Sequence, residues 1–214
     1  MSDDSQTQSG PGRPKDPVKR ESILDAAKCL FIQHGYEGCS MDAIASAASV
    51  SKLTVYSHFG DKEALFSAAV KSKCQEQLPE LLFDLPDDMP IESALQTIGE
   101  AFFCLVNNPE SINFHRVMVA NASSHPKLAN LFFEAGPQRV INEMERLLRR
   151  AVQAKKLDLP NPEIAADQFL CLTKGSVNFR LLMGCETMPP EDEIARLVKP
   201  VVDLFMRAYG PRAK

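Results

Sequence analysis

The chain has 214 residues, of which 44% are hydrophobic and 24% charged, as is ordinary for a globular protein. No uncharged apolar run approaches the roughly 20 residues that a membrane span needs, and residues 1–12 lack the apolar stretch of a signal peptide. We therefore expect a cytoplasmic protein. The six cysteines, at positions 29, 39, 74, 104, 171 and 185, form no CxxC pair, which predicts reduced thiols and no metal site.

The net charge of −4 is unevenly distributed along the chain. Residues 12–73 carry nine Lys and Arg against seven Asp and Glu, whereas residues 74–214 carry fifteen against nineteen. Four of the cations, Arg13, Lys15, Lys19 and Arg20, fall within eight positions. A basic end on an acidic body is typical of a protein that contacts phosphate with that end only.

The sequence up to Gly60 predicts a disordered arm followed by helices. Residues 1–16 are rich in Ser, Gln, Gly, Pro and Asp and should lack structure on their own. From Pro17 apolar residues recur at three- and four-residue spacing, and Gly35 is placed to end that helix. Ser40 and Ser51 are suited to cap two short helices at about 42–48 and 52–58. Gly60 ends the second, and Asp61 can cap a longer helix.

Beyond about residue 77 the predicted helices lengthen and are separated by prolines. We place them at 91–107, 110–121, 126–134, 137–156, 162–184 and 191–209. No segment sustains the period-two alternation of a strand. The predicted fold is all-α, with an arm at 1–16, a three-helix domain at 17–73 and a helical bundle domain at 74–214.

The segment from Ser40 to Phe59 has the layout of a helix-turn-helix. Ile44, Ala45 and Ala48 are apolar or small enough for two short helices to cross closely at the turn Ser49-Val50-Ser51. The start of the second helix can then enter the major groove of DNA. Its outward side chains would be Lys52 and Thr54, followed by Tyr56, Ser57 and His58, which supply donors for phosphate oxygens or base edges.

Residues 23–66 resemble the DNA-binding domain of the TetR family. The resemblance rests on Phe-x-x-x-Gly-Tyr after the first helix, Val-Ser-x-x-Thr-x-Tyr-x-His-Phe in the third, and Lys-Glu-x-Leu-Phe in the fourth. It implies a TetR-like regulator, with Ser49 and Leu53 standing where the family usually or often has glycine. The DNA-contacting positions that we predict from the resemblance and the helix are Ser40, Ser51, Lys52, Leu53, Thr54, Tyr56, Ser57, His58 and Lys62.

Alternatives stay open at several of these positions. Tyr56 could be a core side chain, His58 could pack against the domain, and Lys62 could be a plain solvated lysine. Upstream, Gly12-Arg13-Pro14-Lys15 resembles the short arms that enter the minor groove, where Arg is attracted to narrow A·T tracts. The same four residues could instead form a solubilising tail.

The C-terminal part resembles the family only in architecture, which implies a bundle whose last two helices form a dimer interface. Residues 163–183 and 191–209 carry more apolar side chains than one buried face needs, although a monomeric core would also use them. The predicted interface residues are Phe169, Leu172, Leu197, Val201 and Phe205. The predicted ligand-binding residues are Phe102, Phe103, Phe114, His115, Met118, Phe133, Asn178 and Phe179, and for each of them core packing is the alternative.

The sequence carries no HExxH, GxSxG, GxGxxG or P-loop motif, so we expect neither an enzyme nor a bound cofactor. The prediction is a DNA-binding transcriptional regulator, a repressor that binds a palindromic operator as a homodimer. A hydrophobic small-molecule effector would release it, and its targets would be efflux or metabolic genes. A protein of the same fold that answers to a protein partner, or to no ligand, stays open, as does activation in place of repression.

Overall fold

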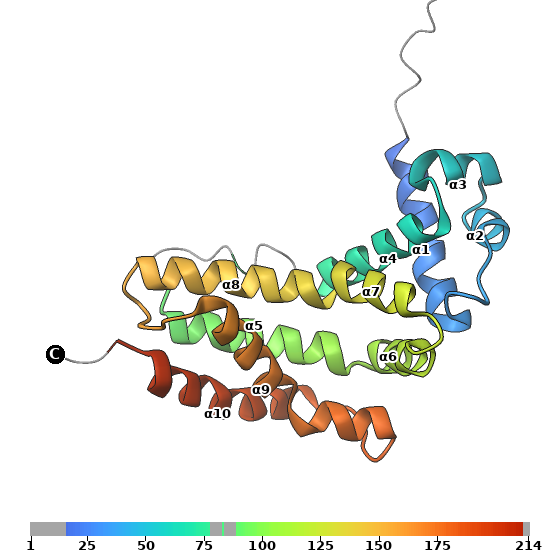
Figure 1. The fold of residues 1–214 in the computed structure, drawn as a ribbon. Helices are drawn as coiled ribbons and strands as arrows, with labels where there is room; N and C mark the ends of the chain where they lie inside the picture. The colour runs from blue at the N-terminus through green and yellow to red at the C-terminus, as the bar shows by residue number, and fades with distance from the viewer. Residues whose placement is uncertain (1–15, 78–82, 84–88, 212–214) are drawn as a thin grey trace, which may run out of the picture.

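A computed structural model describes residues 16–77, 83 and 89–211, and within these ranges the regular structure is helical, without a strand. None of the described helices is long and apolar enough to cross a membrane. Figure 1 shows a small group of helices at one end of a longer bundle. The helices are α1 (Pro17–His34), α2 (Met41–Ala47), α3 (Lys52–Phe59), α4 (Lys62–Gln77), α5 (Ile91–Asn107), α6 (Pro109–Asn121), α7 (Pro126–Ala135), α8 (Pro137–Gln153), α9 (Pro162–Met183) and α10 (Glu191–Tyr209).

Local signals in the sequence explain where these helices begin and end. The helices α1, α6, α7, α8 and α9 each begin with proline, whose fixed φ and missing N–H suit the first helical position. Gly35 follows α1 with φ 68°, and Gly184 follows α9 in the left-handed region with φ 75°. The predicted all-α fold is confirmed.

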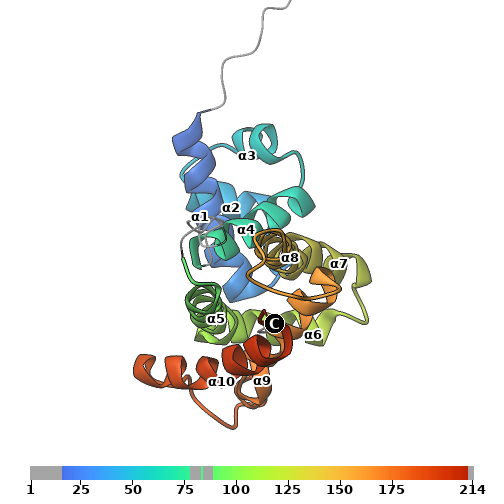
Figure 2. The same ribbon diagram turned by 90° about the vertical axis from the view of Figure 1, so that its left-hand side faces the viewer.

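The apolar side chains form two separate clusters. The first joins α1 to α4 around Phe31, Ile44 and Phe66, and it also takes in Met118 of α6 and Leu128 of α7. The second joins α5, α8, α9 and α10, which lie side by side in Figures 1 and 2. The group of helices that contains α2 and α3 therefore has its own core and also rests on α6 and α7.

Helix α4 connects the two clusters. It packs on α1 in the first cluster and also contacts α5 and α7. Ion pairs add to these contacts, between Lys127 of α7 and Glu63 at 2.8 Å and between Lys73 and Glu110 of α6 at 2.6 Å. Because α4 is continuous to Gln77, it runs past the domain boundary expected at residue 73.

Helix α9 is kinked at Gly175. Its backbone angles there, φ 57° and ψ −169°, are accessible essentially only to glycine. The first half of α9 packs between α5 and α8, and the end of the second half is tied to α6. The tie is made by Arg116, which donates hydrogen bonds to the carbonyls of Leu181 and Leu182 at 2.7 and 2.8 Å.

Candidate nucleic-acid interface and ligand pocket

The helix pair α2 and α3 is built as the sequence predicts. The Ser40 hydroxyl accepts a hydrogen bond from the Ala43 amide, and the Ser51 hydroxyl accepts one from the Thr54 amide, both at 3.1 Å. Each serine thereby satisfies an amide that the first turn of a helix leaves without a partner. Between them Ser49 takes φ 54°, so the turn adopts its left-handed conformation without glycine.

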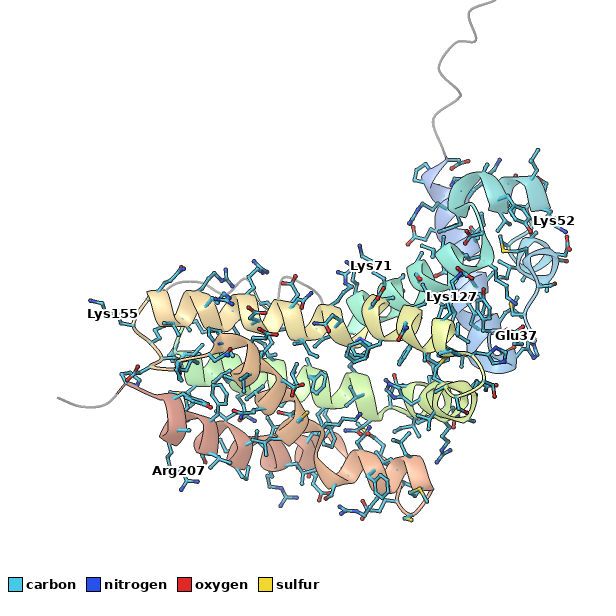
Figure 3. All side chains as sticks on the ribbon, in the orientation of Figure 1. Glu37, Lys52, Lys71, Lys127, Lys155 and Arg207 are labelled. Atoms are coloured by element: carbon cyan, nitrogen blue, oxygen red, sulfur yellow. The ribbon has the colours of Figure 1, made fainter. Side chains whose placement is uncertain are left out.

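One face of α3 is anchored in the core and the other is open to solvent. Val55 and Phe59 are buried. Leu53 is 79% exposed and Tyr56 41% exposed, which excludes the alternative that Tyr56 is a core side chain. Lys52 and Ser57 are exposed as well, and Figure 3 shows Lys52 at the outer end of the molecule. Helix α3 therefore presents a surface that can reach a DNA groove.

Some polar groups on this surface have partners within the chain. The Lys52 ammonium pairs with the Asp42 carboxylate of α2 at 2.7 Å, and this hydrogen bond raises the pKa of Lys52. The hydroxyls of Thr54 and Ser51 lie 2.8 Å apart, and the Ser57 hydroxyl donates to the Thr54 carbonyl. Contact with DNA through Lys52 or Thr54 would exchange these bonds for new ones.

His58 and Lys62 flank the end of α3. His58 is half-buried, and its Nδ1 atom is buried with no hydrogen-bond partner among the described residues. The Lys62 ammonium lies 4.2 Å from the ring centroid of Tyr36, so it is held by a cation–π contact and is not a plain solvated lysine. Burial raises the pKa of Tyr36 to about 12, which keeps its phenol neutral under the cation. The predicted arm residues Arg13 and Lys15 lie outside the described residues.

The bundle contains a large, mostly apolar cavity. It encloses about 1020 Å³ of empty space, part of it open to solvent. Helices α4 to α9 all contribute to its wall. Four aromatic rings line it, those of Phe102, Phe114, Phe132 and Phe133. A mostly apolar wall with a few polar groups is typical of a site for an apolar small molecule.

The polar groups of the cavity come mainly from α6 and α9. Ser111 and His115 come from α6, and Asp167, Cys171 and Lys174 come from α9. Burial, reinforced by the Lys174 charge, lowers the pKa of His115 to about 4, so this imidazole is neutral at pH 7. The Cys171 thiol donates to the Asp167 carboxylate at 3.8 Å.

A smaller hollow adjoins this cavity. It holds about 380 Å³ between α1, α4 and α6, and part of that space is also open to solvent. Val70, Lys73, Ser111 and Phe114 line both spaces. Val70 and Lys73 of α4 therefore border both the bundle cavity and the smaller hollow beside the first core cluster.

Two family models account for nearly all of the described chain. Residues 23–69 match the model described as bacterial regulatory proteins of the tetR family. Residues 93–211, more than half of the chain, match the C-terminal domain of AefR-like transcriptional repressors. The chain belongs to the TetR family of transcriptional regulators. It is a DNA-binding regulator of the TetR type, and α2 with α3 is its helix-turn-helix.

Relatives of this TetR-family regulator match over almost the whole chain. The transcriptional regulator SrpR of Pseudomonas putida is 25% identical over 186 residues, covering 87% of this chain and 83% of SrpR. The structure of the flavonoid-responsive regulator FrrA is 31% identical, with a TM-score of 0.71, and covers 92% of this chain and 100% of its own. A TetR-family regulator from Mesorhizobium loti is 26% identical, with a TM-score of 0.76 over 91% of this chain and 99% of its own.

Half of the predicted pocket residues of this TetR-family regulator lie at the cavity. Phe102, Phe114, His115 and Phe133 line it, whereas four others do not. Phe103 and Met118 are buried in the two core clusters. Asn178 is buried and donates to the Val106 carbonyl and to Asn107 Oδ1, and Phe179 is 65% exposed on the outer surface. Lys73, Asp167, Cys171 and Lys174 also line the cavity and were not predicted from the sequence. The helices were predicted from the spacing of apolar residues, and this spacing does not show which polar side chains point into a cavity.

Of the five predicted dimer residues, two are buried inside the subunit and three are at least partly exposed. Phe169 and Phe205 are wrong, because their rings pack edge to face at 5.3 Å within the subunit core and are almost fully buried. Leu172 is 46% exposed, and Leu197 and Val201 are partly buried. The exposed large apolar side chains of α9 and α10 are Ile164, Leu172, Phe179, Met183 and Leu204.

Proposed function

We propose that this regulator is a dimeric repressor that binds a palindromic operator and leaves it when a mostly apolar small molecule enters the bundle cavity. The observation that carries the proposal is the shared helix α4. Its residues Val70 and Lys73 line the cavity, while Leu65 and Phe66 of the same helix are buried in the core that supports α3. A molecule that favours a different position of α4 would therefore move the recognition helices.

The chemistry of α3 supports the operator contact. Lys52, Tyr56 and Ser57 are exposed donors on a helix whose opposite face is anchored, and Lys62 stands at the start of α4, where the helix dipole favours phosphate. Two such helices in a dimer would read half-sites one DNA turn apart, about 34–36 Å. We also propose that Ser40, Thr54 and His58 contribute at the edge of this surface, and Arg13 and Lys15 in the minor groove.

The dimer would form through the outer face of α9 and α10. Leu172 lies before the kink of α9 and is 46% exposed, whereas Phe179 and Met183 lie one turn apart after it and are each 65% exposed. An apolar stripe of this kind on two adjacent helices suits burial against its own copy across a two-fold axis.

The size and lining of the cavity favour a small-molecule effector over control by a protein partner or by no ligand. The flavonoid responsiveness of FrrA, 31% identical to this chain, supports an aromatic effector. We propose efflux or metabolic genes as its targets, because such genes let a cell dispose of an apolar compound that the regulator detects.

The operator contact is tested by binding of labelled DNA, first from the region upstream of its own gene. Lys62→Ala should reduce the slope of log affinity against log salt by about one unit and weaken binding to all sequences alike. Lys52→Ala should weaken preferred sites by roughly 5- to 150-fold and lower the preference for them. Arg207→Ala, at the opposite end of the molecule in Figure 3, is the matched control. Wild-type binding by both test variants would refute the assignment of α3.

The dimer is tested by sedimentation at micromolar concentration. Leu204→Glu and Phe179→Glu should yield monomers that no longer bind the operator, although the reading helix is untouched. Val119→Glu places the same charge on a residue of α6 that is 71% exposed, and it should leave the dimer intact. A monomeric wild-type protein would overturn the proposed assembly.

A further inference from the structure

Two nitrogen groups from different helices line the cavity, His115 of α6 and Lys174 of α9. The two helices pack on each other, and the Lys174 charge adds to burial in lowering the pKa of His115. Phe102, Phe114 and Phe132 line the same cavity. A ligand that fills this space can therefore contact both nitrogen groups.

The His115 ring is fixed but incompletely bonded. It packs edge to face on Phe132, with ring centroids 5.4 Å apart. Its Nδ1 atom is buried, and no group among the described residues hydrogen-bonds to it. A neutral imidazole carries one donor and one acceptor, and leaving either buried without a partner is unfavourable.

Lys174 differs from the other lysine of the cavity. Lys73 is paired with Glu110 at 2.6 Å. Lys174 is half-buried, and the ion pairs found among the described residues do not include it. Asp167 lies two turns before it on α9 and accepts a hydrogen bond from the Cys171 thiol, and the ion pairs found among the described residues do not include Asp167 either. A half-buried ammonium without a counter-charge favours an oxygen acceptor from a ligand.

We propose that the cavity binds an aromatic ligand through a phenolic hydroxyl placed between His115 and Lys174. A hydroxyl accepts from the ammonium and, because it both donates and accepts, it also suits either tautomer of the imidazole. A carboxylate has no proton to donate and would be repelled by Asp167, and an amine would be repelled by Lys174. This inference rests on the proposed role of the cavity as the effector site.

The test compares four probes of one ring system, which are naphthalene, β-naphthol, its methyl ether and β-naphthoate. Their dissociation constants are measured by calorimetry on the full chain without DNA. For the wild type we expect β-naphthol to bind about tenfold more tightly than the methyl ether, the ratio that one hydrogen bond of ordinary strength produces. Naphthalene should bind no better than the ether.

Two variants assign the preference to its residues. His115→Phe should reduce the ratio between β-naphthol and its ether to nearly one, because only the hydroxyl can donate to the imidazole. Lys174→Met should weaken both β-naphthol and its ether relative to naphthalene, because both oxygens accept from the ammonium. Lys71→Met, an exposed lysine of α4 outside the cavity, is the matched control and should keep the wild-type ratio. Thermal unfolding of each variant confirms that it is folded.

Equal binding of β-naphthol and its ether by the wild type would overturn the inference, as would tightest binding of β-naphthoate or no binding of any probe. Release of operator DNA is measured separately. A hydroxyl preference that depends on His115, together with tighter binding of both oxygen compounds that depends on Lys174, supports the inference even if DNA is not released, and in that case only the proposed function fails.

Discussion

Replacing Ser49 by glycine should make the protein more stable. Ser49 is one of two non-glycine residues with positive φ in the described chain, at 54° in the turn between α2 and α3. An L-residue in this region costs about 1–2 kcal/mol. Glycine removes that cost but gives the unfolded chain more freedom, which offsets about 0.5–1 kcal/mol. Backbone hydrogen bonds from Ser49 to Ser46 and from Val50 to Ala45 are kept. The net gain should therefore be about 0.5–1 kcal/mol.

Thermal and urea unfolding measure this gain. For a chain of this size it corresponds to a rise in Tm of about 1–4 °C, with an unchanged urea m-value. Ser49→Ala keeps a Cβ atom and should change little. Lys155→Gly is a matched control, since Lys155 has φ 57° far from the helix-turn-helix, and it should gain a similar amount. If Ser49→Gly lowered the free energy of unfolding while Lys155→Gly raised it, the serine side chain would stabilise the turn and the argument from φ would be refuted.

Three further changes test other parts of the molecule. Because the pKa of His115 is lowered to about 4, the unfolded state binds one more proton than the folded state between about pH 6.5 and pH 4. The free energy of unfolding should therefore fall by about 3 kcal/mol as the pH drops through this range. Unfolding of His115→Phe, measured against pH, should lack this loss. Gly99→Ala would bring a Cβ atom within 2.6 Å of Val198 Cγ1, so urea unfolding should show a loss of about 1–3 kcal/mol that Val198→Ala partly restores. Deletion of residues 1–15 should keep the unfolding transition and weaken binding most at operators flanked by A·T tracts, whereas equal affinity at all flanks would favour a solubilising tail.

The helices could be predicted closely because their ends are encoded locally. Pro109, Pro126 and Pro162 each begin a helix, and Ser40 and Ser51 cap the helix that follows them. Such signals act within one turn and need no knowledge of the tertiary structure. The conformation of the turn at Ser49 was less predictable, because the family resemblance implies glycine there and a serine could keep the left-handed angle or change the turn; the structure keeps the angle.

The pocket was only half predictable, because side-chain direction depends on how the helices pack. In a straight helix Cys171, Lys174 and Asn178 would share one face, at i, i+3 and i+7. The kink at Gly175 breaks that register, so Lys174 lines the cavity while Asn178 turns to Asn107 of α5. A glycine inside an apolar helical pattern gives little warning of such a break, since it is also tolerated in straight helices.

The position of α4 places a physical condition on any effector. A ligand shifts an equilibrium only by the difference between its affinities for the two states, so a molecule that contacts neither α4 nor the helices α6 and α7 of the first core cluster would bind without moving the recognition helix. The walls shared with the smaller hollow, Val70 and Lys73, are where ligand contact can change the position of α4. Lys73 is held to Glu110 of α6, so a ligand that draws its ammonium away weakens a link between α4 and the bundle. A molecule anchored at Lys174 must therefore also contact α4, or α6 and α7, if it is to release DNA.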